Sequence, residues 1–155
     1  MITRSQPLFK RGAEANPTPS SDRKAPLIAT AERGDARTVS VLLHFGADVE
    51  ARDASADGRG RTPLLSAIAT GEAEAVKTLL EAGANLLATD AEGRSGLMLA
   101  AQRGDLEVAR ILLERSECAE LLSMTDAEGK NALHFAATEE SADMAHFLIE
   151  NGIGM

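Results

Sequence analysis

The sequence predicts an all-α repeat solenoid, in which helix-turn-helix units stack side by side and β-hairpin-like loops join them. Three features of the 155-residue chain indicate this architecture. Four segments align in one register, each starting near an anchor leucine. A second apolar pair follows each anchor after fifteen residues, and a glycine stands seven residues after three of the four anchors. Self-similarity at a period of this size is typical of stacked repeats.

The anchors and the apolar pairs define the units. The anchors are Leu27, Leu64, Leu97 and Leu133, and the pairs are Leu42-Leu43, Leu79-Leu80, Leu112-Leu113 and Leu148-Ile149. The anchor spacings are 37, 33 and 36 residues. A unit of 33 residues with insertions of four and three residues explains all three spacings.

Each unit has the sequence pattern of two short helices. In the third unit Leu97, Ala100 and Ala101 have helical spacing, and Gly104 follows where a left-handed residue would end the helix. A second amphipathic stripe begins at Val108 and precedes a polar, turn-rich stretch. No unit can bury both stripes alone, so stacking is expected to form one continuous core.

The division of the chain follows from this pattern. We expect a flexible, basic N-terminal tail over residues 1–24 and a repeat domain over residues 25–155, with units of about 25–56, 57–89, 90–125 and 126–155. The tail has five basic and two acidic residues, three prolines and no apolar period, whereas the rest of the chain has a net charge of −11. A short mitochondrial presequence within the tail remains an alternative, because residues 1–13 contain no acidic residue.

Composition excludes several classes of function. The net charge of −8 argues against nucleic acid as a partner, since phosphate neutralisation needs a basic surface. No run of 18 uncharged apolar residues is present, so no membrane span and no membrane partner are predicted. The single cysteine, Cys118, cannot form an intramolecular disulfide, which favours an intracellular, cytoplasmic location.

This pattern resembles the ankyrin repeat family. The best unit, residues 57–90, has a D-x-x-G-x-T-P-L opening, a mid-unit glycine, a leucine pair and a G-A-N close. Only Thr62-Pro63 keeps the T-P pair. Ser116-Glu117 replaces the closing Gly-Ala of the third unit, and Glu140 replaces the mid-unit glycine of the fourth. We therefore expect an irregular loop after the third unit and a less stable fourth helix pair.

Few residues suggest chemistry, and we expect no catalytic, cofactor-binding or metal site and no enzyme activity. The resemblance implies a structural His134, whose ring hydrogen-bonds the backbone of the turn. His146 and Glu150 are four residues apart on a helix, but two candidate metal ligands without a third favour a solvated helix face. His44 suits a helix C-terminus. Cys118 has no adjacent histidine that would activate a thiol.

The resemblance implies that the loop tips and the exposed sides of the first helices form a concave, protein-binding face. The residues carried over onto that face are Arg59, Arg61, Glu92, Arg94, Gln102, Arg103, Glu128, Lys130, Thr138 and Glu139. Basic residues gather here although the body is acidic, and arginine is enriched at binding hot spots. We expect Arg59, Arg61 and Arg94 to form a basic ridge that pairs with carboxylates of the partner.

Two functions follow as hypotheses. The first is a non-catalytic module that binds another protein as an adaptor or regulator. The alternative is an inhibitor or antidote that binds and blocks an enzyme or toxin. At the C-terminal edge we expect Met144, Phe147 and Ile153 to be only partly covered, which suggests a truncated longer protein, self-association or a covering partner.

Overall fold

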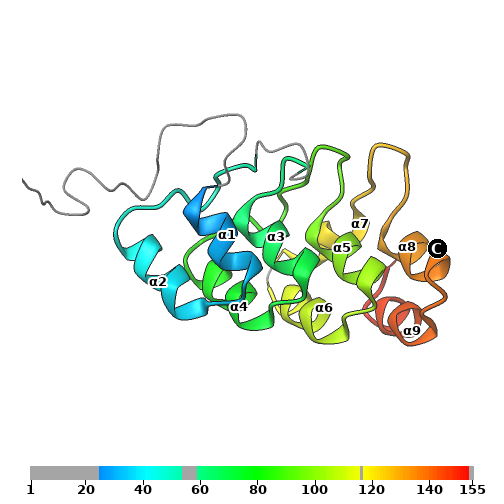
Figure 1. The fold of residues 1–155 in the computed structure, drawn as a ribbon. Helices are drawn as coiled ribbons and strands as arrows, with labels where there is room; N and C mark the ends of the chain where they lie inside the picture. The colour runs from blue at the N-terminus through cyan, green and yellow to red at the C-terminus, as the bar shows by residue number, and fades with distance from the viewer. Residues whose placement is uncertain (1–24, 54–58, 116, 154–155) are drawn as a thin grey trace, which may run out of the picture.

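A computed structural model describes residues 25–53, 59–115 and 117–153 of the chain (Figure 1). Residues 1–24, which the sequence predicts to be a tail, lie outside the described residues, as do residues 54–58 of the first long loop. Within the described ranges the chain forms nine α-helices and no strand. This confirms the predicted all-α repeat solenoid.

Eight of the nine helices form four successive pairs. The pairs are α1 (Pro26–Glu32) with α2 (Ala36–His44), α3 (Pro63–Thr70) with α4 (Ala73–Glu81), α5 (Gly96–Arg103) with α6 (Leu106–Leu113), and α8 (Ala132–Thr138) with α9 (Ala142–Glu150). The remaining helix, α7 (Cys118–Ser123), lies between the third and fourth pairs in the sequence. A long loop precedes each of α3, α5 and α8, and these loops project on one side of the stack (Figure 1).

The helices stack in two rows, and the core is continuous between them. The first helices α1, α3, α5 and α8 pack on one another in order, and so do the second helices α2, α4, α6 and α9. In the second and third units the anchor leucine and the first leucine of the apolar pair are fully buried; Leu64, Leu79, Leu97 and Leu112 are each at most 1% exposed. Alanines at 0% exposure, such as Ala67 and Ala100, let neighbouring helices approach closely. Burial of both stripes thus depends on the neighbouring units.

Local signals explain where the first helices begin and end. The Thr62 and Ser95 side chains accept hydrogen bonds from the backbone N–H groups of Leu65 and Met98, which caps α3 and α5. Gly71 ends α3 with a left-handed φ of +78°. In the fourth unit Glu140 adopts the same left-handed region, at φ +57°.

The two predicted insertions lie at different places. The first insertion lengthens the loop before α3. In that loop the Asp53 N–H donates to the carbonyl of Arg61, eight residues later, whereas in the next loop the corresponding bond joins Asp90 N–H to the carbonyl of Arg94, four residues later. The second lies between α6 and Asp126 and contains α7. The expected irregular loop is therefore partly helical, because Leu121 and Leu122 are buried, at 1% and 8% exposure, and α7 packs against α6.

The C-terminal edge differs from the prediction. Met144 is 0% exposed and Ile153 is 5% exposed, so the expectation that both are only partly covered is wrong. Ile153 donates its backbone N–H to the Leu148 carbonyl at 3.1 Å, which folds the chain back after α9. Phe147 is half-buried as expected, and the exposed apolar side chain at this edge is Ile149, at 44%. None of the helices in the described ranges is long and apolar enough to cross a bilayer.

Candidate functional site

The tips of the projecting loops are joined to one another. Ala91 N–H donates to the Arg59 carbonyl at 2.8 Å, and Ala127 N–H donates to the Glu92 carbonyl at 3.1 Å. These backbone bonds connect tips that are one repeat apart in sequence. Side chains on neighbouring tips are therefore held at a defined spacing along the stack.

An aspartate closes each of the two fully described tips. Asp90 Oδ1 accepts the N–H groups of Glu92 and Arg94, both at 2.9 Å. Asp126 Oδ1 accepts the corresponding N–H groups of Glu128, at 2.8 Å, and Lys130, at 2.9 Å. The turn backbone is thus the same in both loops, and only the side chains distinguish them.

Arg94 is not part of an exposed ridge, which corrects the prediction. The residue is only 7% exposed, and its Nε donates to Asp90 Oδ2 at 3.0 Å. Its Nη2 lies 2.9 Å from Glu92 Oε1, and its Nη1 lies 3.4 Å from Gln102 Oε1. All three nitrogens of the Arg94 guanidinium are therefore bonded to its own loop or to α5, so the side chain stabilises the tip rather than facing a partner.

Arg59 remains accessible. Its side chain is 53% exposed, and its Nη1 lies 3.2 Å from Glu92 Oε1. Glu92 is 57% exposed and joins Arg59 of one tip to Arg94 of the next. An ion pair this exposed contributes little to stability, so Arg59 can exchange Glu92 for another carboxylate.

Arg61 is the unusual member of the set. It is half-buried, and its Nε is fully buried with no hydrogen-bond acceptor among the residues that the structure describes. Burial lowers the pKa of Arg61, and the positive charges of Arg94 and Arg59 lower it further, while Asp90 and Glu32 act in the opposite direction. The guanidinium still stays charged at neutral pH, because its ordinary pKa is so high.

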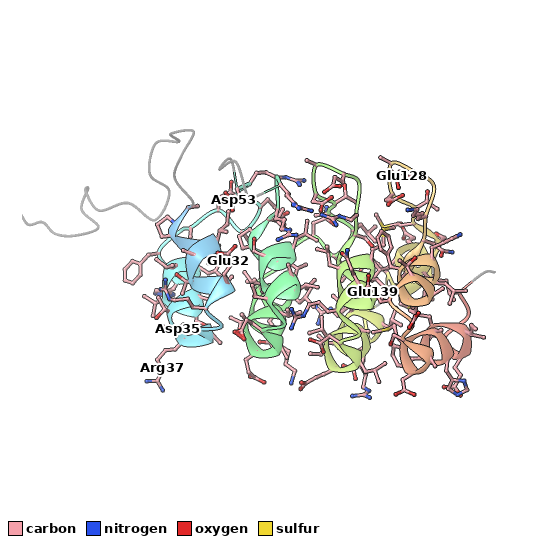
Figure 2. All side chains as sticks on the ribbon, turned by 45° about the vertical axis from the view of Figure 1, so that its right-hand side comes forward. Glu32, Asp35, Arg37, Asp53, Glu128 and Glu139 are labelled. Carbon is pink, nitrogen blue, oxygen red and sulfur yellow. The ribbon has the colours of Figure 1, made fainter. Side chains whose placement is uncertain are left out.

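The predicted positions on α5 and α8 have local partners. Gln102 is exposed and accepts the bond from Arg94, while Arg103 is exposed and donates through Nη1 to the Ala69 carbonyl at 3.1 Å. Thr138 Oγ1 donates to the His134 carbonyl at 2.9 Å, within its own helix. Glu139 is the exposed residue directly after α8, and Figure 2 labels it at the fourth unit.

The last tip has its own ion pair. Lys130 Nζ lies 3.0 Å from Glu128 Oε1, and both side chains are exposed, at 50% and 72%. Hydrogen bonding to Glu128, together with the charge of that carboxylate, raises the pKa of Lys130. The structure thus brings Arg59, Arg61, Glu92, Arg94 and Gln102 together around the middle tips, whereas Glu128, Lys130, Thr138 and Glu139 belong to the fourth unit.

Sequence reasoning missed several residues that join the units. Arg52 Nη1 donates to the Gly60 carbonyl at 2.9 Å and also to the Thr89 carbonyl of the next loop. Arg115 Nη2 donates to the Leu80 carbonyl at 3.2 Å, one unit back. The acceptors are backbone carbonyls of the neighbouring unit, so no side-chain motif in the sequence signals these contacts.

The residues considered for chemistry have structural or exposed positions. His134 Nδ1 accepts the Asn131 N–H at 3.1 Å and helps to cap α8, which confirms its predicted structural role. His146 Nε2 lies 3.3 Å from Glu150 Oε2, and both side chains are exposed. In the part of the chain that the structure describes, no three His, Cys, Asp or Glu side chains gather in a way that could hold a metal ion.

Comparison with known families agrees with this architecture. A family model described as "Ankyrin repeats (3 copies)" matches residues 5–90 and 85–155. The chain belongs to the ankyrin repeat family. A search of curated proteins finds no match to the sequence. Ankyrin repeats are generally protein–protein interaction modules and are typically non-catalytic.

Proposed function

We propose that this ankyrin repeat chain is a non-catalytic module that binds another protein through its loop tips and the concave face beside them, as an adaptor or regulator. The observation that carries the proposal is Arg61. A buried polar atom without a hydrogen-bond partner is uncommon in folded proteins, and the Arg61 Nε is such an atom. The Arg61 side chain as a whole is only half-buried and lies beside an exposed tip, so a ligand bound there can supply acceptors to the remaining N–H groups of its guanidinium.

The chemistry of that ligand follows from the guanidinium groups. Arg94 is buried and bonded through all three nitrogens, so the accessible guanidinium groups of the middle tips are those of the half-buried Arg61 and the exposed Arg59. Guanidinium groups pair with carboxylates through two parallel hydrogen bonds. We therefore expect an Asp, Glu or C-terminal carboxylate of the partner to bind at Arg61, with Arg59 beside it.

The surrounding charge limits what else the partner can contain. Glu92 and Glu128 on the tips and Glu139 after α8 are exposed acidic residues of the same proposed face. The repeat domain as a whole has a net charge of −11, which would slow encounter with a uniformly acidic molecule. A partner segment of mixed charge, with a carboxylate for Arg61 and basic residues for the acidic neighbours, fits best.

The test begins with a pull-down on the full chain and continues with isothermal titration of the partner it returns. We expect Arg61→Ala to weaken binding by about 2 kcal/mol, roughly 30-fold, if Arg61 is a hot spot. The matched control is Arg37→Ala, an exposed arginine on α2 that Figure 2 shows far from the loop tips. Equal affinities for the wild type and Arg61→Ala, or an equal loss in Arg37→Ala, would contradict this assignment.

The inhibitor or antidote hypothesis uses the same face. If the partner is an enzyme or toxin, its activity measured with and without the chain separates blocking from simple tethering. Loss of that effect in Arg61→Ala, with the melting temperature unchanged, would connect it to the loop tips.

A further inference from the structure

Large apolar side chains are exposed at both ends of the described stack. Val41 on α2 is 46% exposed, and Phe45, the residue after α2, is 57% exposed. Ile149 on α9 is 44% exposed. Figure 1 shows α2 and α9 at opposite ends of the row of second helices. Singly exposed apolar residues are ordinary on protein surfaces, so the positions of these three in the repeat register decide what they mean.

The junctions between units show what these positions contact inside the stack. A surface groove between α2 and α4 is lined by Leu43 on one side and by Thr78 and Ala82 on the other. At the next junction Leu80, which matches Leu43, is only 3% exposed, and Arg115, which matches Ala82, donates to its carbonyl at 3.2 Å. The second residue of each apolar pair thus faces the following unit. The residues that match Thr78 and Ala82 face the preceding one.

The exposed apolar residues occupy these same positions at the two ends. Ile149 is the second residue of the last apolar pair, so it faces forward along the stack, away from the third unit. Val41 and Phe45 match Thr78 and Ala82, so they face backward from the first unit. The α9 end therefore presents the forward-facing apolar side chain of a junction, and the α2 end presents the pair of positions that such a side chain meets.

The two ends also differ in charge. The last helix pair, residues 132–150, contains four acidic residues and no Lys or Arg, whereas the first pair, residues 26–45, contains two arginines and two acidic residues. All four acidic residues of the last pair are exposed, and so are both arginines of the first pair. An acidic surface attracts arginine and repels a copy of itself. Contact between unlike ends is therefore favoured over contact between two α9 ends.

The stack already defines a place for one of these arginines. Arg33, the residue after α1, matches Arg103 of the third unit. Arg103 crosses the turn of the preceding unit: it donates to the Ala69 carbonyl at 3.1 Å, and a Cβ added at Gly71 would lie 2.7 Å from its Nη2. In the fourth unit the Gly71 position is held by Glu140, which is exposed. An arginine that follows the fourth unit in this register meets a carboxylate.

We propose that copies of this chain associate head to tail, with the first unit of one copy stacked on the fourth unit of another as though the repeats continued. Ile149 of one copy then packs against Val41 and Phe45 of the second copy, and Glu140 pairs with Arg33 of the second copy. The contact joins two different surfaces, so each copy keeps a free end and longer stacks grow as the concentration rises. The loops project from the side of the stack, so their tips remain accessible (Figure 1).

Contact between two α2 ends explains less of the structure. It would cover Val41 and Phe45 but leave Ile149 exposed, and it would bring the arginines of both copies to one junction. The head-to-tail contact covers all three apolar side chains and pairs opposite charges. A second copy stacked in register is therefore the occupant that both ends support.

Sedimentation velocity of the full chain over a range of concentrations provides the first test, and we expect the sedimentation coefficient to rise with concentration. Val41→Asp blocks the α2 end, and Ile149→Asp blocks the α9 end. Each variant alone should remain monomeric. An equal mixture of the two should form a dimer and no larger species, because each variant supplies the end that the other lacks. Unchanged melting temperatures show that both variants fold.

Charge reversal gives a second, independent readout at the same junction. Arg33→Glu and Glu140→Arg should each weaken association at least about tenfold, because each places like charges together. Mixing these two variants, or combining both changes in one chain, should restore association. The matched control is Arg110→Glu on α6, an exposed arginine of the third unit, which alters the net charge equally and should leave association unchanged.

Three outcomes would overturn the proposal. The first is a wild type that stays monomeric at every concentration. The second is continued dimerisation of Ile149→Asp alone or of Val41→Asp alone, which would show that two like ends meet. The third is an equal loss of association in Arg110→Glu and Arg33→Glu, which would assign the effect to net charge rather than to the junction.

Discussion

The second and fourth units contain the same helix pair but differ in their neighbours. Helices α3 and α4 pack against units on both sides, whereas α8 and α9 pack only against earlier units within the described residues. The residue at the turn between the two helices also differs between these units. In the second unit the turn residue is Gly71, and a Cβ added there would lie 2.7 Å from Arg103 Nη2 of the next unit.

The fourth unit has Glu140 at the same position, with a left-handed φ of +57°. In the earlier units a side chain of the following unit crosses the turn glycine: Glu72 approaches Gly34, and Arg103 approaches Gly71. The turn glycine therefore meets two separate requirements: it adopts a positive φ, and it leaves room for a side chain of the next unit. Glu140 meets the first demand at a cost in backbone strain.

The largest expected effect is on the buried leucines. Leu79→Ala or Leu112→Ala should lower the free energy of unfolding by about 2–5 kcal/mol, as for other buried Leu→Ala changes. Leu148, also 0% exposed, should cost less when truncated, because a terminal unit has fewer interfaces and can relax around the cavity. Denaturant titration measures all three, and equal losses would contradict the difference between central and terminal units.

Arg94 and Lys130 occupy matching positions in two loop tips, but only Arg94 is buried. Arg94→Ala should lower the free energy of unfolding by about 2–3 kcal/mol, because it leaves the carboxylate of Asp90, whose side chain is 0% exposed, without its charged partner. Lys130→Ala in the matching position of the last tip should change the free energy of unfolding by less than about 0.5 kcal/mol, since that pair is exposed. Equal effects of the two substitutions in thermal or chemical unfolding would show that Arg94 is not a structural residue.

The turn residues allow a test in both directions. Glu140→Gly should raise the free energy of unfolding by about 1 kcal/mol by removing the left-handed strain. Gly71→Ala should lower it by about 1–2 kcal/mol, from the φ of +78° and from the contact with Arg103.

Glu140→Gln is the control for these two variants, because it removes the charge and keeps the backbone strain. A stabilisation by Gln as large as that by Gly would assign the effect to charge rather than to φ. Chemical denaturation of the three variants beside the wild type makes this distinction.

The smallest expected effect concerns acid and the first unit. Hydrogen bonds from the Thr38 hydroxyl and the Thr38 N–H lower the pKa of Asp35, the N-cap of α2, below the ordinary value of an aspartate. A carboxyl with a depressed folded-state pKa stabilises the fold above its unfolded pKa, and this contribution is lost as pH falls through the folded value. Asp35→Ser keeps a cap that does not titrate. As the pH falls below about 4, the melting temperature of the wild type should therefore decrease more than that of Asp35→Ser. A melting-temperature difference between the two proteins that does not depend on pH would contradict the assignment.

Much of the fold could be predicted from local pattern. The anchors and apolar pairs predicted the helices, because a stripe of period 3.6 has to be buried against a neighbour. Glycines at Gly71 and Gly104 predicted the turns, since both adopt positive φ. The segment after α6 was harder: Ser116-Glu117 indicated an irregular loop, whereas burial of Leu121 allows α7 to form there.

The candidate site was less predictable. Sequence reasoning placed Arg59, Arg61 and Arg94 on one face, and it treated all three as equally available. The structure separates them: Arg94 is buried and bonded through all three nitrogens, Arg59 is exposed, and the Arg61 Nε is buried without an acceptor among the described residues. That difference comes from how each side chain folds over the tip, which depends on Asp90, Glu92 and Gln102 together.

The family, the period and the helix pairs follow from the sequence alone. These depend on residues within one unit, and the repetition of the same unit confirms each of them several times over. The availability of each charged side chain, and the identity of the residues that join the units, depend on the tertiary structure. The Arg103 side chain bonds to the backbone carbonyl of Ala69, and the Arg115 side chain bonds to that of Leu80, each in another unit. Every residue has a backbone carbonyl, so the sequence contains no pattern that identifies which carbonyl will accept such a bond.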